Sequence, residues 1–172
     1  MYATVLQEPR PLTHKDERER FQSGNAEIDD WFHRFAWQNH SVGNARIFIT
    51  TQEPETLGFY ALAMGAVERS TLPDALKPRR RPDPCPILLL ARLAVDQRAQ
   101  GRGIGAALLK DALLRAYKLS NEVGFAALLV HCANDHARDF YLNQSSSFVP
   151  CPGAENHLVL PLHALREFID TL

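Results

Sequence analysis

Hydrophobic positions near the amino-terminal end follow the period of an α-helix. One face of a helix repeats every three or four residues, and this spacing separates Ile28, Trp31, Phe32 and Phe35. Asn25 precedes this stripe and is a favourable N-cap, and acidic residues follow it where the helix dipole favours negative charge. The pattern predicts a helix that starts after Asn25 and ends near residues 41–43.

Later apolar segments have the length and composition of β-strands. The run 87–95 is almost entirely apolar, as is typical of a central strand covered on both faces. We expect strands at Arg46–Thr50, Leu57–Ala63, Ile87–Val95, Phe125–His131 and His157–Leu162. We expect helices at 103–120 and Asn134–Gln144, an irregular proline-rich segment at 68–86, and a short tail at Leu165–Leu172. This order predicts an α/β (mixed α+β) fold, with a mixed sheet and helices on both faces.

Length, charge and cysteine usage narrow the class of protein. A chain of 172 residues predicts a single domain, residues 1–172, with a full core. The net charge of −1 means that nucleic-acid binding needs a local basic patch. Three widely spaced cysteines favour neither disulfides nor a zinc site. The start of the sequence lacks a signal-peptide core, and no apolar run approaches the ~20 residues of a membrane span. We therefore expect a cytoplasmic protein without metal or membrane segment.

Alternating glycines lie between the predicted strand 87–95 and the helix that follows it. Gly101, Gly103 and Gly105 let the backbone approach an anion closely, and the positive end of the helix adds to the field. Arg98 and Arg102 add positive charge at the same place. The segment therefore predicts a phosphate or pyrophosphate site, with a plain glycine turn as the alternative.

Three types of phosphate loop compete for this segment. The P-loop string does not occur in the sequence. The dinucleotide fingerprint fits Gly101–Ala106 nominally, but it lies past the midpoint of the chain, and His131 and Cys132 stand where an acid is needed. The third type, Q/R-x-x-G-x-G, is the pyrophosphate loop of acetyl-coenzyme A enzymes. Gln100–Gly105 matches it at each defined position, after a buried strand and before a helix.

Two segments resemble the GNAT family of N-acetyltransferases. LARLAVDQRAQGRGIGAALLKDAL, residues 90–113, is similar to the family's fourth strand, pyrophosphate loop and following helix. VHCANDHARDFY, residues 130–141, is similar to the fifth strand and next helix, with the N-x-x-A-x-x-F-Y pattern from Asn134 to Tyr141. The resemblance implies a mostly antiparallel sheet whose fourth and fifth strands splay apart. It also implies acetyl-coenzyme A (acetyl-CoA) as co-substrate and no metal.

The same resemblance assigns coenzyme-binding and catalytic residues. The expected coenzyme contacts are Leu93, Ala94, Val95, Arg98, Gln100, Gly101, Arg102, Gly103, Ile104, Gly105, Ala106, Asn134 and Tyr141. Backbone N–H groups around Leu93–Val95 serve as oxyanion donors. Tyr141 serves as the acid that protonates the departing thiolate, since a phenol with a pKa of ~10 is protonated at pH 7.

Each of these assignments has a structural alternative. Tyr141 could be a packed aromatic, Asn134 a helix cap, and either arginine a solvated surface residue. His131 lies beside the expected site as a wall residue, with a proton relay as its alternative role.

A narrower resemblance links the amino-terminal part to the GNAT toxins of bacterial type II toxin–antitoxin systems. FQSGNAEIDDWFHRFAWQNHSVGNARIFI, residues 21–49, is similar to the opening of those toxins. Members acetylate the α-amino group of aminoacyl-tRNA and so block translation. The resemblance implies a ribbon-helix-helix antitoxin and a homodimer as partners. One departure follows Tyr141, where serines at 145–147 replace the usual glycine, so a different turn is expected.

A basic cluster on the proline-rich segment is a candidate tRNA contact. Four cations fall within the five residues Lys77–Arg81. The expected phosphate contacts are Arg46, Arg69, Lys77, Arg79, Arg80, Arg81 and Arg92. A solvated loop or an antitoxin-binding surface is the alternative, and no stacking platform accompanies the cluster.

Two other functions remain open at this point. The first is a GNAT enzyme that acetylates a protein N-terminus or a small-molecule amine. The second is a catalytically silent coenzyme A-binding interaction module, which the altered segment after Tyr141 keeps possible.

Overall fold

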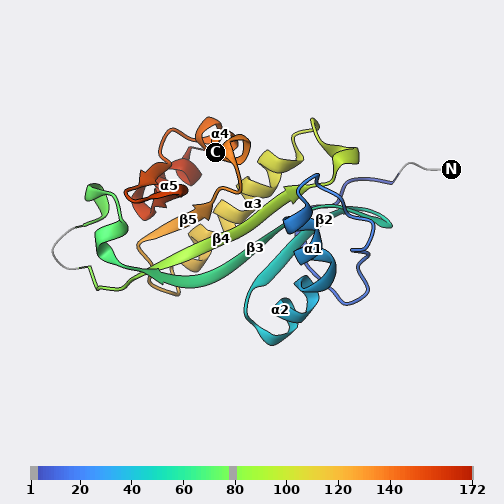
Figure 1. Cartoon of the computed structure of the whole chain (residues 1–172), viewed down its shortest axis with the longest axis horizontal. Coiled ribbons are helices and arrows are strands. Elements are labelled where there is room, and N and C mark those ends of the chain that lie inside the picture. The colour runs from blue at the N-terminus through green and yellow to red at the C-terminus, as the bar shows by residue number, and fades with distance from the viewer. Residues whose placement is uncertain (1–3, 78–80, 172) are drawn as a thin grey trace. The chain divides into compact units, whose positions relative to one another are not determined.

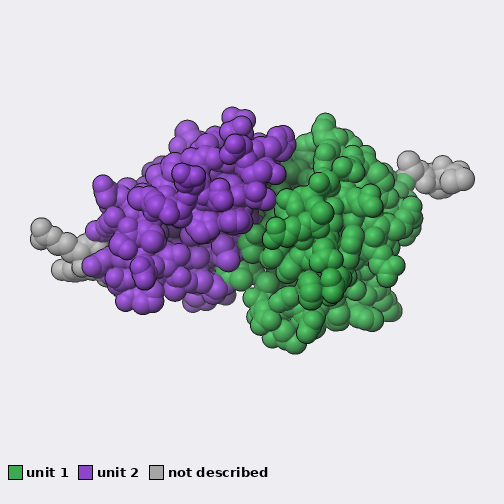
Figure 2. Space-filling view, in the orientation of Figure 1, with its two compact units in different colours: residues 1–63, 91–112 green, residues 64–90, 113–172 purple. Residues whose placement is uncertain are grey.

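The computed structural model describes residues 4–77 and 81–171, which divide into two compact units. The first unit contains residues 1–63 and 91–112, and the second contains residues 64–90 and 113–172 (Figure 2). Strands β3 (Glu55–Val67) and β4 (Cys85–Val95) and helix α3 (Ile104–Leu119) each contribute residues to both units. Among the described residues, no helix is long and apolar enough to cross a bilayer.

In the described residues, seven strands are hydrogen-bonded in the order β1-β2-β3-β4-β5-β7-β6. Strands β2, β3, β4 and β5 are labelled in Figure 1. The other strands are β1 (Arg10–Pro11), β2 (Arg46–Gln52), β5 (Ala127–His131), β6 (Val149–Cys151) and β7 (Ala154–Pro161). Pairing is antiparallel for β1–β2, β2–β3, β5–β7 and β6–β7. Pairing between β4 and β5 is parallel and covers Leu88–Leu90 with Leu128–Val130. The predicted mixed α/β fold and mostly antiparallel sheet are confirmed.

Aromatic side chains fill the core of the first unit. Helix α1 (Ala26–Arg34) begins as predicted, since the Asn25 side chain accepts hydrogen bonds from the backbone N–H groups of Glu27 and Ile28. The rings of Phe32 and Phe59 stack at 4.2 Å between centroids, and both side chains are fully buried. This stack fixes α1 against β3.

The predicted first helix is interrupted at Phe35. Its backbone leaves the helical region at φ −121°, and α2 (Ala36–Val42) starts immediately afterwards. The prediction of one continuous helix was therefore wrong at this residue. Phe35 is also 39% exposed, so it does not continue the buried stripe of α1.

The second unit has its own core between β5, β7 and the proline-rich segment. Its buried side chains include Leu72, Leu76, Cys85, Ile87, Leu129 and Val159. Short 3₁₀ turns at Arg69–Thr71 and Asp74–Leu76 position Leu72 and Leu76 in this core. The segment that contains these turns was expected to be irregular. The three cysteines are free and buried.

Three elements lie where no regular structure was expected. Helix α5 (Leu162–Asp170) occupies the segment expected to be a tail, and it packs on β7. Strand β6 has only three residues and takes its register from β7. Strand β1 has only two residues and pairs with Phe48 and Ile49 of β2.

Candidate active site

A buried carboxylate organises the loop that follows β4. Asp96 is 1% exposed and accepts hydrogen bonds from the backbone N–H of Gln22 at 3.0 Å and of Arg98 at 2.8 Å. The Arg98 guanidinium adds two further bonds to Asp96, from Nε at 2.8 Å and Nη2 at 3.0 Å. Burial opposes ionisation of Asp96, but these hydrogen bonds prevail and lower its pKa.

The structure gives Arg98 a partner on each side. Its Nη1 also donates to Glu55, so the guanidinium lies between two carboxylates. The hydrogen bonds that Arg98 donates to Asp96 and Glu55 raise its pKa. Arg98, predicted as a phosphate contact, therefore holds the loop to β3, a role that its sequence position did not reveal.

Gln100 fixes the next part of the loop. Its Nε2 donates to the carbonyl of Val95 at 3.0 Å and to the carbonyl of Ser23 at 2.8 Å. The side chain thus joins the end of β4 to the segment before α1. Arg102, by contrast, is exposed, and its one side-chain hydrogen bond in the described chain, to Gln52, is long at 3.4 Å.

The glycines form an open, donor-rich turn in front of α3. Gly101 has φ +80° and Gly103 has φ +78°, a region that disfavours side chains. No heavy atom lies within 4 Å of the position that a Cβ would take at either residue. The positive φ, rather than close internal packing, accounts for glycine at both positions, and the space beside them is open.

The first turn of α3 suits a negatively charged ligand. It contains no acidic residue, and its leading N–H groups have no partner within the helix. Ile104 is 3% exposed and anchors the turn, whereas Gly105 and Ala106 are half-buried beside the opening. Ala94 is buried in the core, and Leu93 and Val95 flank it as half-buried residues at the end of β4. The residues present therefore fit a pyrophosphate group.

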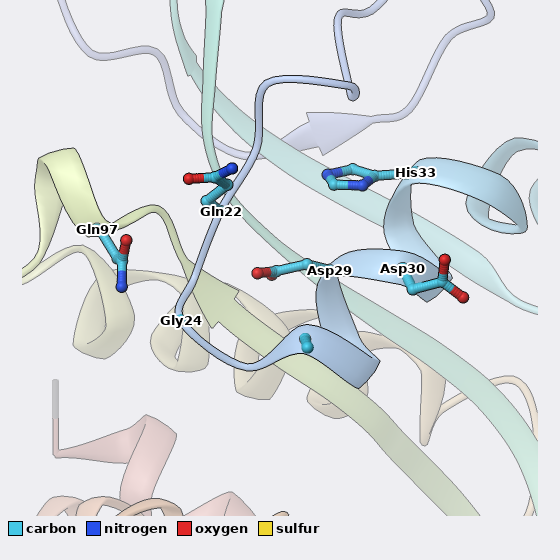
Figure 3. Close-up of a pocket in the computed structure, with 7 residues that line it drawn as sticks. Gln22, Gly24, Asp29, Asp30, His33 and Gln97 are labelled. Carbon is cyan, nitrogen blue, oxygen red and sulfur yellow. The ribbon is translucent and has the colours of Figure 1, made fainter.

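A separate cavity of about 350 Å³ lies between the amino-terminal segment and α1 (Figure 3). Its lining residues are Gln22, Gly24, Ala26, Asp29, Asp30, His33 and Gln97. Asp29 is nearly buried and accepts hydrogen bonds from the N–H and hydroxyl of Ser23. Two aspartates make this cavity unsuitable for a pyrophosphate, in contrast to the glycine turn.

In the second unit, Tyr141 lies on α4 (Asp135–Gln144) and is 4% exposed. Its ring contacts those of Phe140 and Phe148 at centroid distances of 5.2 and 5.7 Å. Within the described chain its hydroxyl makes no hydrogen bond. Burial, with a contribution from Cys132, raises the pKa of Tyr141. The hydroxyl is therefore protonated at neutral pH and available as a donor.

Asn134 has the capping role that was its structural alternative. Its Oδ1 accepts a hydrogen bond from the backbone N–H of Ala137 at 2.9 Å. The side-chain amide nitrogen takes no part in this cap. His131 is exposed at the end of β5 and contacts the ring of His157 on β7 at 5.1 Å.

The turn after α4 forms without a glycine. Ser145 ends the helix in an extended conformation, with φ −155°, and its hydroxyl accepts a hydrogen bond from the N–H of Ser147. Phe148 then returns to the core at 3% exposure and packs on Tyr141. The turn contains no glycine, unlike the family's sequence pattern, and Tyr141 packs against Phe148.

The predicted tRNA contacts have different surroundings. Arg46 is exposed and donates to the carbonyl of His40. Arg69 donates to the carbonyl of Arg81, and Lys77 lies 3.6 Å from Asp74. Arg92 stacks over the ring of Trp31. Arg79 and Arg80 lie outside the described residues.

Comparisons with known proteins identify the family of this chain. Residues 43–144, more than half of the chain, match the model of the acetyltransferase (GNAT) domain. The chain belongs to the GNAT acetyltransferase family. The open glycine turn before α3 is therefore the turn of an acetyl-CoA-dependent N-acetyltransferase.

The similarity to individual GNAT proteins extends over almost the whole chain. A tRNA-acetylating toxin of Mycobacterium tuberculosis is 39% identical over 161 residues, which cover 94% of this chain and 95% of that protein. The solved structure of AtaT complexed with acetyl-methionyl-tRNAfMet superposes with a TM-score of 0.84 at 29% identity, covering 96% and 99% of the two chains.

A second solved structure has an antitoxin and the coenzyme bound. It is a tyrosine-to-phenylalanine mutant of AtaT bound to the C-terminus of the antitoxin AtaR and to acetyl-CoA. Its TM-score is 0.79 at 26% identity, with 95% of this chain and 98% of that chain covered. The described residues of this GNAT acetyltransferase contain no group of three or more His, Cys, Asp or Glu side chains that could hold a metal ion.

Proposed function

We propose that this GNAT acetyltransferase is a toxin that transfers acetyl from acetyl-CoA to the α-amino group of aminoacyl-tRNA and so blocks translation. The observation that carries the proposal is the open turn at Gly101 and Gly103, in a chain similar over nearly its whole length to a tRNA-acetylating toxin. An acetylated α-amine cannot serve as a nucleophile, which explains how such a transfer stops protein synthesis.

Backbone N–H groups of residues 100–106 hold the pyrophosphate. The two positive-φ glycines and the positive end of α3 support this role, because they present donors and partial positive charge to an anion. Arg102 is the exposed cation nearest in sequence to the turn and balances phosphate charge. Arg98 acts indirectly in this scheme, by fixing the loop through Asp96 and Glu55.

The chemistry needs one oxyanion donor and one acid. The neutral amine nitrogen attacks the thioester carbonyl carbon, and a backbone N–H of Leu93–Val95 stabilises the oxyanion. As the C–S bond breaks, the Tyr141 hydroxyl gives its proton to the sulfur. The proton lost by the amine then restores Tyr141 through solvent. An α-amine with a pKa of about 7.7–8.0 or below needs no strong base.

Asn134 binds the pantetheine arm of the coenzyme. Its amide nitrogen donates to a carbonyl of the pantetheine arm, while its Oδ1 continues to cap α4. One side chain then both starts the helix of Tyr141 and orients the coenzyme.

Partners follow from the same proposal. The exposed Arg46 contacts a tRNA phosphate together with Arg69, Arg92 and the basic segment 77–81. A ribbon-helix-helix antitoxin neutralises the toxin, which acts as a homodimer in the cytoplasm, where charged tRNA is found. The solved complex of AtaT with the C-terminus of the antitoxin AtaR supports the proposal that an antitoxin is a partner.

Growth of bacteria that express the chain tests the proposal. Expression of the wild type is expected to stop growth, and Tyr141→Phe is expected to restore it with the fold intact, because only one hydroxyl is removed. Circular dichroism of the purified variant checks the fold. Growth arrest by a folded Tyr141→Phe variant at the wild-type level would refute the role of the phenol.

A further inference from the structure

Arg92 forms the outermost layer of an aromatic stack. Its guanidinium carbon lies 4.1 Å from the ring centroid of Trp31 on α1. The Trp31 ring is in turn nearly parallel to that of Phe59, at 16° and 6.2 Å. Phe59 is fully buried, whereas Trp31 and Arg92 are half-buried, so the stack rises from the core to the surface. All three residues belong to the first unit.

The guanidinium of Arg92 has no polar partner in the described chain. Burial lowers its pKa, and only the charge of Glu27 opposes this. Arg10 and Arg98, by contrast, are each paired with carboxylates. Partial burial of an unpaired cation costs free energy that a structural role would avoid. Stacking on Trp31 offsets part of this cost. No hydrogen bond within the described chain uses the guanidinium donors of Arg92.

The position of Arg92 relates it to the proposed chemistry. It lies on β4 directly before Leu93–Val95, the segment that supplies the oxyanion donor. At ~3.3 Å per residue along a strand, its Cα is about 10 Å from that of Val95. Arg92 therefore shares a strand with the residues proposed to supply the oxyanion donor.

We infer that Arg92, oriented by Trp31, binds a phosphate of the single-stranded acceptor end of the charged tRNA. The inference rests on the proposed function, and it adds the positioning role of Trp31 and the part of the tRNA that Arg92 contacts. A guanidinium fixed in one plane presents a two-pronged donor edge that matches two phosphate oxygens. Lysine has a similar charge but neither the plane nor the fork. In this pair Arg92 contacts the substrate, and Trp31 is a positioning residue.

Steady-state transfer with two acceptors tests the pair. One acceptor is charged tRNA, and the other is an amino-acid amide, which has the α-amine but no phosphate. Arg92→Lys is expected to raise KM for charged tRNA about tenfold, the loss of roughly one charge-assisted hydrogen bond. KM for acetyl-CoA and kcat/KM for the amide are expected to stay within about twofold.

Variants at Trp31 separate position from charge. Trp31→Leu keeps the cation but removes its platform, and it is expected to raise KM for charged tRNA in the same way. Trp31→Phe keeps an aromatic ring and is expected to retain most of the affinity for charged tRNA. This second variant keeps the test informative if Trp31→Leu fails to fold. Arg34→Lys is the matched control, because Arg34 also lies over a ring, Phe35, but is exposed and paired with Asp30.

Three results are decisive. An unchanged KM for charged tRNA in Arg92→Lys would overturn the inference. Equal losses with tRNA and the amide would overturn it as well, since the pair would then support the site in general. Failure of the wild type to acetylate charged tRNA, with transfer to the amide intact, would instead overturn the proposed function.

Discussion

At the scale of single residues, Asp96 decides how the coenzyme loop is held. One buried carboxylate accepts bonds from two segments and from Arg98, so its loss affects both sides of the loop. Asp96→Asn is expected to lower the free energy of unfolding by about 1–3 kcal/mol at pH 7. Urea denaturation measures the difference, and a variant as stable as the wild type would contradict this role.

The same residue gives stability a pH dependence with a defined sign. The pKa of Asp96 is lowered in the folded state, so its contribution is full above the unfolded value of about 3.9. The contribution disappears as pH falls through the lower folded value. Wild type and Asp96→Asn should therefore differ in stability less at acidic pH than at pH 7, and a constant difference would argue against ionisation as the cause.

Tyr141 has the opposite shift, and this affects the pH profile of catalysis. Its raised pKa keeps the hydroxyl protonated, while the acceptor amine loses its proton at about pH 7.7–8.0 or below. We expect kcat/KM to rise through the amine pKa and then to stay level up to pH 9.5. Tyr141→Phe should lower that plateau by about 10²–10⁴ without moving the rise. A decline of the wild type near pH 8 would exclude Tyr141 as the acid.

The sequence predicted the cap at Asn25 from a local pattern. The catalytic role expected for Tyr141 stays a prediction. The pairing of Arg98 with Asp96 and Glu55 did not follow from a local pattern, because Glu55 is more than forty residues away in the sequence. The stack of Arg92 on Trp31 was missed for the same reason, since only the fold brings β4 against α1.

At the scale of elements, the glycine turn before α3 is the part that depends most on backbone conformation. Gly103→Ala is expected to cost about 1–2 kcal/mol of conformational strain and to weaken acetyl-CoA binding, because the turn must change shape. Gly153→Ala is the matched control, since Gly153 has φ +73° and open space around it but lies in the β6–β7 turn.

Calorimetric titration with acetyl-CoA compares the two variants. Similar losses of stability with a loss of affinity only in Gly103→Ala would support the assignment of the turn. Equal coenzyme affinity in both variants would show that the turn does not contact the coenzyme.

Elements with a strong period of their own were predictable, and those formed by their neighbours were not. The run 87–95 and the helix after it carry long apolar patterns, and the structure has them at Cys85–Val95 and Ile104–Leu119. Strands β1 and β6 contain prolines and only two or three residues, so pairing partners define them. Helix α5 was predictable in principle, because Leu165, Phe168 and Ile169 lie on one face.

At the scale of the whole molecule, the proposed reaction needs a coenzyme turn, a phenol and cationic residues. Each part was expected from sequence motifs, whereas the division of the described residues into two compact units was not. A net charge of −1 agrees with local rather than general attraction to tRNA. Removal of cations should therefore change tRNA use and its salt dependence more than coenzyme binding.

Transfer of labelled acetyl from acetyl-CoA to a total pool of charged tRNA tests the central claim most directly. Deacylated tRNA from the same pool is the control, because it has every phosphate but lacks the α-amine. The account predicts label on charged tRNA only, and its release on hydrolysis of the aminoacyl ester. Absence of label from charged tRNA, with acetyl-CoA still bound, would contradict the proposed acceptor.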